Sequence, residues 1–322
     1  MTQEPLVFII HSDDLEKHKR LDTYLGEKIP HLSRSLIKKL FENGEFESKQ
    51  KLSLKKMPSV GTRIIFHDSG PKDTEILAED IPLDILFEDE YLLIINKPAG
   101  MVVHPAPGNY TGTLVNAVLH HCPDLKGIGD EKRPGIVHRL DKGTTGIMMV
   151  AKEQQTHAAL VKLLSKHDII RKYEALIVGA RIPSETFLDA PIGRSPHNRL
   201  KMATDVKNAK VAKTHFKALE FFERLTHCEL KLETGRTHQI RVHLSSLLNA
   251  PILNDHLYGR TKEEQLLLSN QIKGLIKDYE YPFLHAKVLG FIHPITKKEL
   301  FFEKEPPELF QKVLEQLRLE SE

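Results

Sequence analysis

The strongest candidate for chemistry in this sequence is Asp141, which follows Arg139 in a glycine-containing stretch of the chain. Apolar segments typical of buried strands precede and follow it, at residues 136–137 and 147–150. We therefore expect Asp141 on a loop that a rigid scaffold holds in place, where its carboxylate is a candidate nucleophile. Because residues i and i+2 of an extended segment point to the same side, Arg139 would place a cation in the same cleft. A turn aspartate that hydrogen-bonds its own backbone is the alternative.

Further blocks of sequence accompany the Asp141 block. In chain order the blocks are Ile95–Pro105, Gly135–Lys152, Arg171–Tyr173, Leu232–Leu244 and Leu284–Ala286. The most specific are the one that contains His138-Arg139-Leu140-Asp141 and the one that contains Arg236. In residue type, order and spacing these blocks resemble the signature of the RluA/RluD-type RNA pseudouridine synthases, over about residues 80 to 305.

The resemblance implies an isomerisation of uridine in RNA, in which the N1 glycosidic bond breaks, the base turns while it is held, and C5 bonds to C1′. No redox step occurs, so neither a cofactor nor a metal is implied. Asp141 would attack C1′ or stabilise an oxocarbenium-like centre, as carboxylates do in glycoside cleavage. A carboxylate in a closed cleft needs a fixed cation nearby to stay ionised, and the resemblance implies that Arg236 is this partner.

Other positions match the pocket of the same family. Tyr173 matches an aromatic residue that packs against the target base and takes part in proton transfer, and Leu284 matches an apolar buttress. A stacked uridine must be flipped out of the RNA to react. The planar guanidinium of Arg139 would fill the gap that the base leaves, and His138 would orient the loop. A core position for Tyr173 and a pure packing role for Leu284 are the alternatives.

The first part of the chain is expected to form a small separate module. Helices are expected to begin near Arg20 and at Ser33-Arg34, with short strands after Gly44. The pattern resembles an S4 RNA-binding module over residues 14–67, although residues 47–50 stand where that family usually has a Val-Asn-Gly hairpin. This resemblance implies RNA contacts by Arg20, Ser33, Arg34, Lys38 and Lys39. A small helical cap that does not touch RNA is the alternative.

The remaining sequence mixes strands and helices without a βαβ period or an internal repeat. After a polar linker at residues 68–80, a catalytic domain is expected over residues 81–322. Strands are expected at residues 83–87, 92–95, 147–150, 173–178, 214–219, 227–232 and on either side of Pro294, and helices at residues 113–121, 154–166 and after Pro306-Pro307. We therefore predict an α+β fold with a largely antiparallel mixed central sheet, as the resemblance also implies, preceded by the small α/β module.

The charge distribution favours RNA over a membrane as the partner. The 322 residues carry 46 basic and 44 acidic side chains, a net charge of +2. Two stretches are more basic, because residues 14–66 hold 12 basic and 7 acidic residues and residues 194–217 hold 7 basic and 1 acidic. Local basic stretches in a near-neutral chain suit a polyanionic partner, and ordinary solvated faces are the alternative.

Other classes of protein fit the sequence less well. Cys122 and Cys228 lie far apart without a Cys-x-x-Cys pair, which argues against a disulfide framework or a structural zinc site and favours the cytoplasm. No signal peptide is evident, and no apolar run reaches the ~20 residues that span a bilayer. His238 and His243 are not the i, i+4 pair of a zinc helix, which argues against a metal hydrolase.

The sequence therefore predicts an RNA pseudouridine synthase, with large-subunit ribosomal RNA as the expected target, either free or within the assembling subunit. Transfer RNA as the target and a non-catalytic RNA-binding factor of ribosome assembly are the alternatives. The second of these leaves Asp141, Tyr173 and Arg236 unexplained. No membrane partner is expected, and a monomer is the default.

Overall fold

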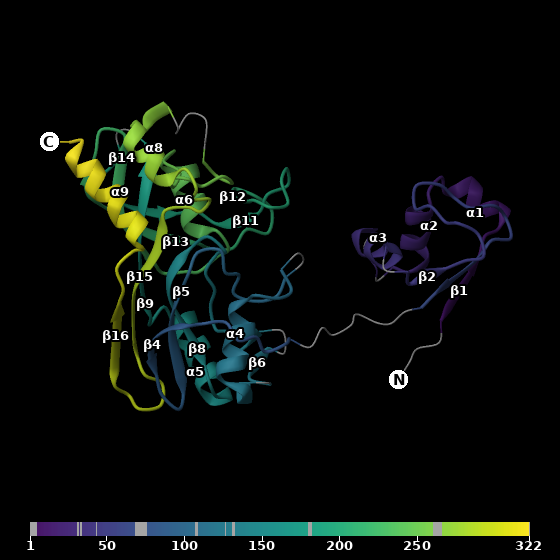
Figure 1. Ribbon diagram of the computed structural model, residues 1–322, viewed down its shortest axis with the longest axis horizontal. Coiled ribbons are helices and arrows are strands. Elements are labelled where there is room, and N and C mark those ends of the chain that lie inside the picture. The colour runs from purple at the N-terminus through teal and green to yellow at the C-terminus, as the bar shows by residue number, and fades with distance from the viewer. Residues whose placement is uncertain are drawn as a thin grey trace. The chain divides into compact units, whose positions relative to one another are not determined.

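The chain divides into two compact units, residues 1–75 and 76–322, in this computed structural model (Figure 1). The structure describes residues 5–30, 32, 34–42, 44–67, 76–106, 109–125, 127–130, 133–179, 182–259 and 266–321, apart from the side chains of residues 35, 36 and 39. Ser33, the Lys39 side chain and residues 68–75 of the expected linker therefore lie outside the described residues. Within these ranges, no helix combines the length and the apolar character needed to cross a membrane.

The first unit packs helices against a small antiparallel sheet. In chain order it contains β1 (Leu6–Ile9), α1 (Ser12–Lys17), α2 (Leu21–Lys28), α3 (Arg34–Glu42), β2 (Phe46–Glu47) and β3 (Arg63–Phe66), with strand order β1-β3-β2. Leu21 and Leu25 lie four residues apart on α2 and enter the same core as Ile37 of α3 and Phe66 of β3. Gly44 follows α3 with a φ of 81°, a conformation that favours glycine. The small α/β unit is present as expected, and its identity as an S4 module stays a prediction.

The second unit is built on a nine-stranded sheet. Its strands are β4 (Asp84–Glu88), β5 (Leu92–Lys97), β8 (Thr145–Ala151), β9 (Ile170–Val178), β10 (Glu185–Asp189), β13 (Lys213–Phe221), β14 (Leu225–Leu232), β15 (Leu284–Ile292) and β16 (Glu299–Glu303). The strand order is β10-β13-β14-β9-β15-β8-β5-β4, with β16 paired to β15. Every pairing is antiparallel except that of β15 with β8. The predicted α+β fold with a largely antiparallel mixed sheet is therefore confirmed.

Helices pack on both faces of this sheet. They are α4 (Leu114–His121), α5 (Gln154–Lys166), α6 (Gln239–Leu247), α8 (Asn270–Ile276) and α9 (Glu308–Leu319), with a short 3-10 helix at Pro123–Leu125. Two small antiparallel pairs add β6 (Gly129–Asp130) with β7 (Arg133–Pro134), and β11 (Ile192–Arg194) with β12 (Met202–Thr204). Successive residues of a strand point to opposite faces, so Ile95 and Val150 share a core with α4 and α9, whereas Ile94 and Met149 pack with Leu160 of α5.

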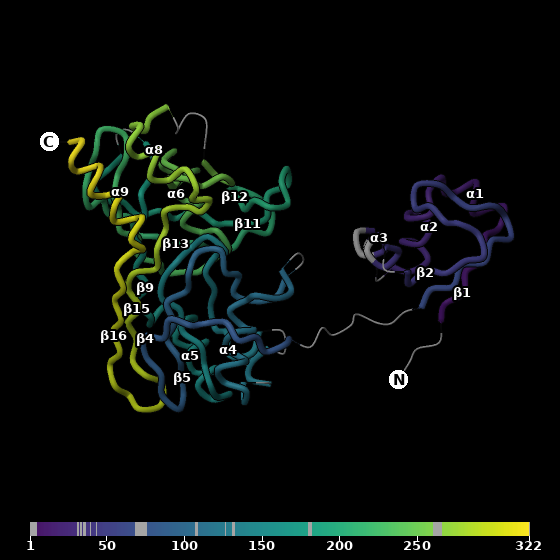
Figure 2. Tube along the Cα trace, viewed as in Figure 1, coloured from purple at the N-terminus to yellow at the C-terminus, as the bar shows by residue number. Residues whose placement is uncertain are grey.

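The parallel contact between β15 and β8 brings together the segments that carry the candidate site. On its other edge β15 runs beside β9 (Figure 2). His285 pairs with Thr145 and Ala286 with Gly146, and Ala286 also pairs with Tyr173 of β9. Gly146 has a φ of 114°, and a Cβ built there would lie 2.3 Å from the carbonyl oxygen of Ala286. Glycine is required at this position because the two backbones approach so closely.

Gly146→Ala is therefore expected to lower the free energy of unfolding by about 3 kcal/mol or more, since it combines an unfavourable φ with a backbone clash. Gly112→Ala is the matched control in the same unit, because Gly112 has a φ of 67° but nothing within 4 Å of an added Cβ. That change should cost only about 1 kcal/mol. Urea unfolding of the two variants measures the difference, and equal losses would contradict the close approach of β8 and β15.

Candidate active site

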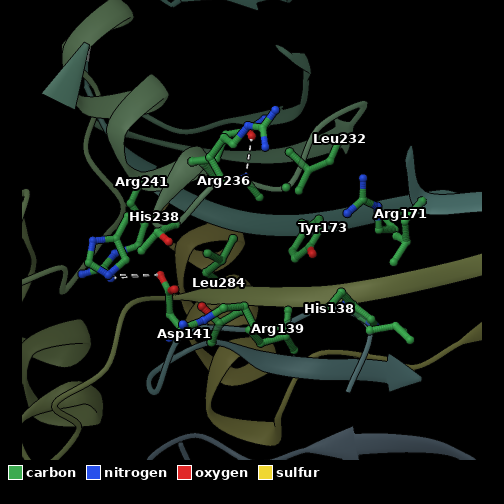
Figure 3. A pocket seen from close by; sticks show the side chains of 18 of the residues that line it. His138, Arg139, Asp141, Arg171, Tyr173, Leu232, Arg236, His238, Arg241 and Leu284 are labelled. Atoms are coloured by element: carbon green, nitrogen blue, oxygen red, sulfur yellow. Dashed lines mark hydrogen bonds and ion pairs between the residues drawn. The ribbon is translucent and has the colours of Figure 1, made fainter. Parts of the chain in front are cut away.

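A pocket of about 340 Å³ in the second unit gathers the residues that the sequence selects (Figure 3). His138, Arg139 and Asp141 come from the loop before β8, Tyr173 from β9, Arg236 from the turn before α6, and Leu284 from the start of β15. Arg171 of β9 and Arg241 of α6 also line the pocket. Every catalytic or pocket residue expected in this unit therefore lies in the wall of one cavity.

The carboxylate of Asp141 is held by Arg241. Its Oδ2 accepts a hydrogen bond of 3.1 Å from Arg241 Nη1, drawn as a dashed line in Figure 3. The other two nitrogens of the same guanidinium, Nε and Nη2, donate to the two carboxylate oxygens of Asp255 at 2.7 and 2.8 Å. Burial opposes the charge of Arg241, but the hydrogen bonds and attraction to Asp255, and then to Asp141, outweigh it and raise its pKa. The cation beside Asp141 is therefore permanently charged.

Asp255 is itself fixed by the backbone. It is fully buried, and its Oδ1 also accepts the backbone N–H groups of Leu257 and Tyr258 at 3.0 and 3.1 Å. The ring of Tyr258 lies over the guanidinium of Arg241, with 5.0 Å between the centroid and Cζ. This arrangement leaves Arg241 little freedom to rotate away from Asp141.

A histidine completes the surroundings of Asp141. Nε2 of His238 lies 3.9 Å from Asp141 Oδ2, and its Nδ1 is hydrogen-bonded to the hydroxyl of Tyr258 at 2.8 Å. Burial lowers the pKa of His238, although the attraction of Asp141 opposes the shift. The imidazole is therefore neutral at pH 7, and Arg241 supplies the positive charge at this side of the pocket.

The floor of the pocket is apolar and aromatic. Tyr173 is only 6% exposed and Leu284 only 5%. Burial raises the pKa of Tyr173, and Asp141 adds to the shift while Arg171 opposes it.

Nε2 of His138 accepts the backbone N–H of Met149 at 3.1 Å, and burial followed by the charge of Arg171 lowers the pKa of His138 to about 3. A neutral, hydrogen-bonded His138 fits the loop-orienting role expected for it.

Lys97 ties the loop after Asp141 to the strand β5. It is fully buried, and its Nζ donates to the carbonyl oxygens of Pro98, Met101 and Lys142 at 2.7, 3.0 and 3.4 Å. Burial lowers its pKa to about 7, and the attraction of Asp141 opposes the shift. Lys97 stands in the block Ile95–Pro105, but its residue type and position alone predicted no role for it.

Comparison with known proteins identifies the family of this chain. A family model described as RNA pseudouridylate synthase matches residues 91–246. The ribosomal large subunit pseudouridine synthase D of Zymomonas mobilis is 42% identical over 307 residues, which cover 93% of this chain and 94% of that protein. This chain belongs to the RNA pseudouridine synthase family. The predicted family and isomerase activity are confirmed.

Other relatives agree with this placement. The synthase is 40% identical to a Bacillus subtilis protein named Uncharacterized RNA pseudouridine synthase YlyB, over 96% of this chain and 97% of that protein. Among solved structures, Human RNA Pseudouridylate Synthase Domain Containing 4 is similar with a TM-score of 0.56 and 30% identity, covering 73% of this chain and 92% of that chain.

The structure of this pseudouridine synthase corrects the expectation for Arg236. Its side chain is exposed, and its Nε donates to the carbonyl oxygen of Val211 at 2.9 Å instead of reaching Asp141. Arg236 precedes α6, whereas Arg241 lies in the first turns of that helix and projects to the Asp141 loop. The prediction that Arg236 pairs with Asp141 was wrong, because the helix places the other arginine of the same block there.

In the first unit of the synthase, Asp22 orients the two described arginines that are expected to touch RNA. Arg20 donates to Asp22 at 3.0 and 2.9 Å, and Arg34 donates to it at 2.8 Å. The bonds from Arg20, followed by those from Arg34, lower the pKa of Asp22 even though burial opposes this. Both guanidinium groups stay partly exposed, as does Lys38, which pairs with Glu42 at 3.6 Å. Their contacts with RNA stay a prediction.

Removal of the buried cation should be far more damaging than removal of the exposed one. We expect Arg241→Gln to lower the single-turnover rate constant for pseudouridine formation by at least about 100-fold, because it leaves two carboxylates without their partner. Arg236→Gln changes the same charge in the same pocket and should cost less than about tenfold. A greater loss in the Arg236 variant would reinstate that residue as the partner of Asp141.

The depressed pKa of Lys97 predicts a pH dependence of stability. Between about pH 7 and its ordinary value of 10.5, the unfolded chain holds a proton on Lys97 that the folded chain has released. The free energy of unfolding of the wild type, relative to Lys97→Met, should therefore rise with pH across this window and stay flat below pH 7. Urea unfolding of both proteins at pH 6, 7 and 9 measures the difference. A difference that does not change with pH would show that the amine keeps an ordinary pKa.

Proposed function

We propose that this chain converts specific uridines of large-subunit ribosomal RNA to pseudouridine. The observation that carries this target is the similarity to proteins named ribosomal large subunit pseudouridine synthase D, at 42% identity in Zymomonas mobilis and 40% in Pseudomonas aeruginosa. The alignments span 93% and 94% of this chain, so they include most of the first unit as well as the pocket. An enzyme with this target would work in the cytoplasm, on free RNA or on the assembling subunit.

Asp141 is proposed as the group that acts at C1′ of the target uridine. Fixed by Arg241, its carboxylate stays ready to attack C1′ or to stabilise positive charge there while the C1′–N1 bond breaks. The base, held against Tyr173 and Leu284, then turns so that C5 forms a bond with C1′. C5 loses its proton and N1 gains one, so the atoms balance without a cofactor. Tyr173 is placed to take part in this proton transfer, since it lines the same pocket.

Arg139 is proposed to hold open the gap in the RNA. It is exposed at the pocket, two residues before Asp141, where a planar guanidinium can stack in place of the flipped base. Flipping costs a few kcal/mol in lost stacking, which this replacement would partly offset.

Basic side chains outside the pocket would hold the RNA backbone. In the stretch 194–217, the side chains of Arg194, Arg199, Lys207, Lys210 and Lys217 are exposed. In the first unit, Arg20, Arg34 and Lys38 are presented to solvent, the first two in orientations set by Asp22. Such contacts position an RNA without reading its sequence, so transfer RNA is the alternative target.

Pseudouridine mapping in a strain that lacks the gene tests the target. We expect pseudouridines to disappear from large-subunit ribosomal RNA, and to return with the wild-type gene but not with Asp141→Asn. In vitro, with chelator present, Asp141→Asn should react at least about a thousandfold more slowly than the wild type.

Two results would contradict the proposal in different ways. Loss of pseudouridine from transfer RNA alone would replace the target while keeping the reaction. Full recovery of ribosomal pseudouridine with Asp141→Asn would remove Asp141 from the chemistry.

A further inference from the structure

The pocket carries an excess of positive charge. Its walls contain Arg133, Arg139, Arg171, Arg236 and Arg241, but Asp141 is its one carboxylate among the described residues. Arg241 is already neutralised by Asp141 and Asp255, and the side chains of Arg133, Arg139 and Arg236 are exposed to water. Arg171 differs from all of these, because it is only 6% exposed.

Arg171 has no acidic partner in the part of the chain that the structure describes. Its Nη2 donates to the carbonyl oxygen of Glu233 at 3.2 Å, and its Nε has no hydrogen-bond partner there. The carboxylate of Glu233 pairs instead with His215, at 2.8 Å. A Cβ built on Gly235 would lie 2.9 Å from Arg171 Nη1, so the backbone turn before α6 closes over the guanidinium. The side chain is thus held in place without being neutralised.

This placement is costly in the free enzyme. Burial lowers the pKa of Arg171, because the charged form has lost most of its hydration. An unpaired buried cation destabilises the free enzyme, and an anion that enters with the substrate would offset this loss. The position of Arg171 also matters, because it lies two residues before Tyr173 on β9, on the same side of the strand. In the view of Figure 3, Tyr173 lies between Asp141 and Arg171.

We propose that Arg171 is the counter-cation for the uracil base after its bond to ribose has broken. The proposal rests on the roles of Asp141 and Tyr173 proposed above. When the C1′–N1 bond breaks, its electron pair stays with the base and spreads over N1, O2 and O4, and C1′ becomes electron-poor. Asp141 faces the positive carbon, and the guanidinium of Arg171 donates to the anionic base until C5 attacks C1′, C5 loses its proton and N1 gains one.

The RNA backbone offers another anion, a phosphate, and burial argues against it. The base is the part of a flipped nucleotide that enters an enzyme pocket most deeply, whereas its phosphates stay near the rim. Exposed arginines such as Arg133 and Arg139 suit phosphates at the rim, and the buried Arg171 suits the base.

Single-turnover kinetics on two substrates separate these possibilities. The substrates are the same RNA, shown to react with the wild type, with uridine or 5-fluorouridine at the target position. Fluorine cannot leave C5 as the proton does, so the rate constant measured on both substrates is that for cleavage of the C1′–N1 bond, followed as loss of the N1-linked nucleoside. Fluorine withdraws electrons and stabilises the detached base as an anion, so it should partly replace the cation. We expect Arg171→Gln to slow the conversion of uridine by about 100-fold with RNA affinity within about threefold, and Arg171→Lys to recover part of the rate. On 5-fluorouridine, the loss in Arg171→Gln should shrink by about tenfold.

The matched control is Lys172→Gln, which removes a cation from the opposite side of the same strand. Lys172 pairs with Glu229 at 3.1 Å and does not line the pocket, so its loss should change neither rate by more than about twofold. Thermal unfolding of each variant checks that it is folded. If Arg171→Gln does not fold, the comparison is made with Arg171→Met, which also removes the charge.

Three results would overturn the inference. Equal losses on uridine and 5-fluorouridine would show that Arg171 only holds the turn before α6. A loss of RNA affinity with an unchanged rate constant would indicate a phosphate contact. Rates close to the wild type would show that the residue is not needed. The proposed function is tested separately by Asp141→Asn. If that variant is active, the assignment of this pocket as the active site is wrong. If it is inactive and any of the three results above is found, only the role of Arg171 is wrong.

Discussion

The ion pair between Arg241 and Asp141 is the interaction on which the pocket depends. The side chain of Arg241 is only 11% exposed, and a single, partly exposed carboxylate would not compensate for the burial of its charge. The fully buried Asp255 supplies a second anion and fixes the orientation of the guanidinium. Asp255 is in turn anchored by the backbone N–H groups of Leu257 and Tyr258. The Asp141 loop, α6 and the turn at Asp255 are thus joined through one arginine, and Asp141 is the member of this network that lines the pocket.

The central sheet holds the segments that carry Asp141 and the other pocket residues in fixed positions. Parallel pairing of β15 with β8 fixes the end of the Asp141 loop against the strand that begins with Leu284, and β9 brings Tyr173 next to Ala286. On the other side of the loop, Lys97 binds the carbonyl of Lys142 from the end of β5. The pocket therefore lies where three neighbouring strands and one loop meet, with a carboxylate toward one end and the buried cation Arg171 on the other side of Tyr173. Such a distribution of charge suits a reaction that separates positive ribose from negative base.

Sequence patterns predicted the elements whose signals are local. The helix expected at residues 154–166 has those bounds, and the one expected after Pro307 begins at Glu308 with its apolar face buried. Continuous apolar runs likewise located β5 and β8, because each strand is buried on both faces. Asp141 was found for the same reason, since a carboxylate between two apolar segments is a local departure from the pattern. The expectation of a strand at residues 136–137 was wrong, because Ile136 forms only an isolated bridge with Val150.

The partner of Asp141 was missed because the start of α6 has no ordinary signal. The N-cap of α6 is His238 with a φ of 56°, rather than Ser, Thr, Asp or Asn. The side-chain oxygen of Gln239, inside the helix, accepts a hydrogen bond from the backbone N–H of Arg236 in place of an N-cap side chain. Without that helix start, Arg236 and Arg241 could not be told apart. Asp255 could not be predicted from the sequence either, because aspartates are common in turns and only the folded chain shows its hydrogen bond to Arg241.

A structure of Asp141→Asn bound to RNA that contains the target uridine would show whether this pocket receives a flipped nucleotide. The uridine is expected to be flipped into the pocket, with C1′ at about 3.5 Å from the side chain of residue 141 and the base between Tyr173 and the guanidinium of Arg171. Arg241 should still contact both Asp255 and residue 141. A uridine that stays stacked in the RNA, or a ribose bound beside Arg236 and away from residue 141, would contradict the assignment of this pocket.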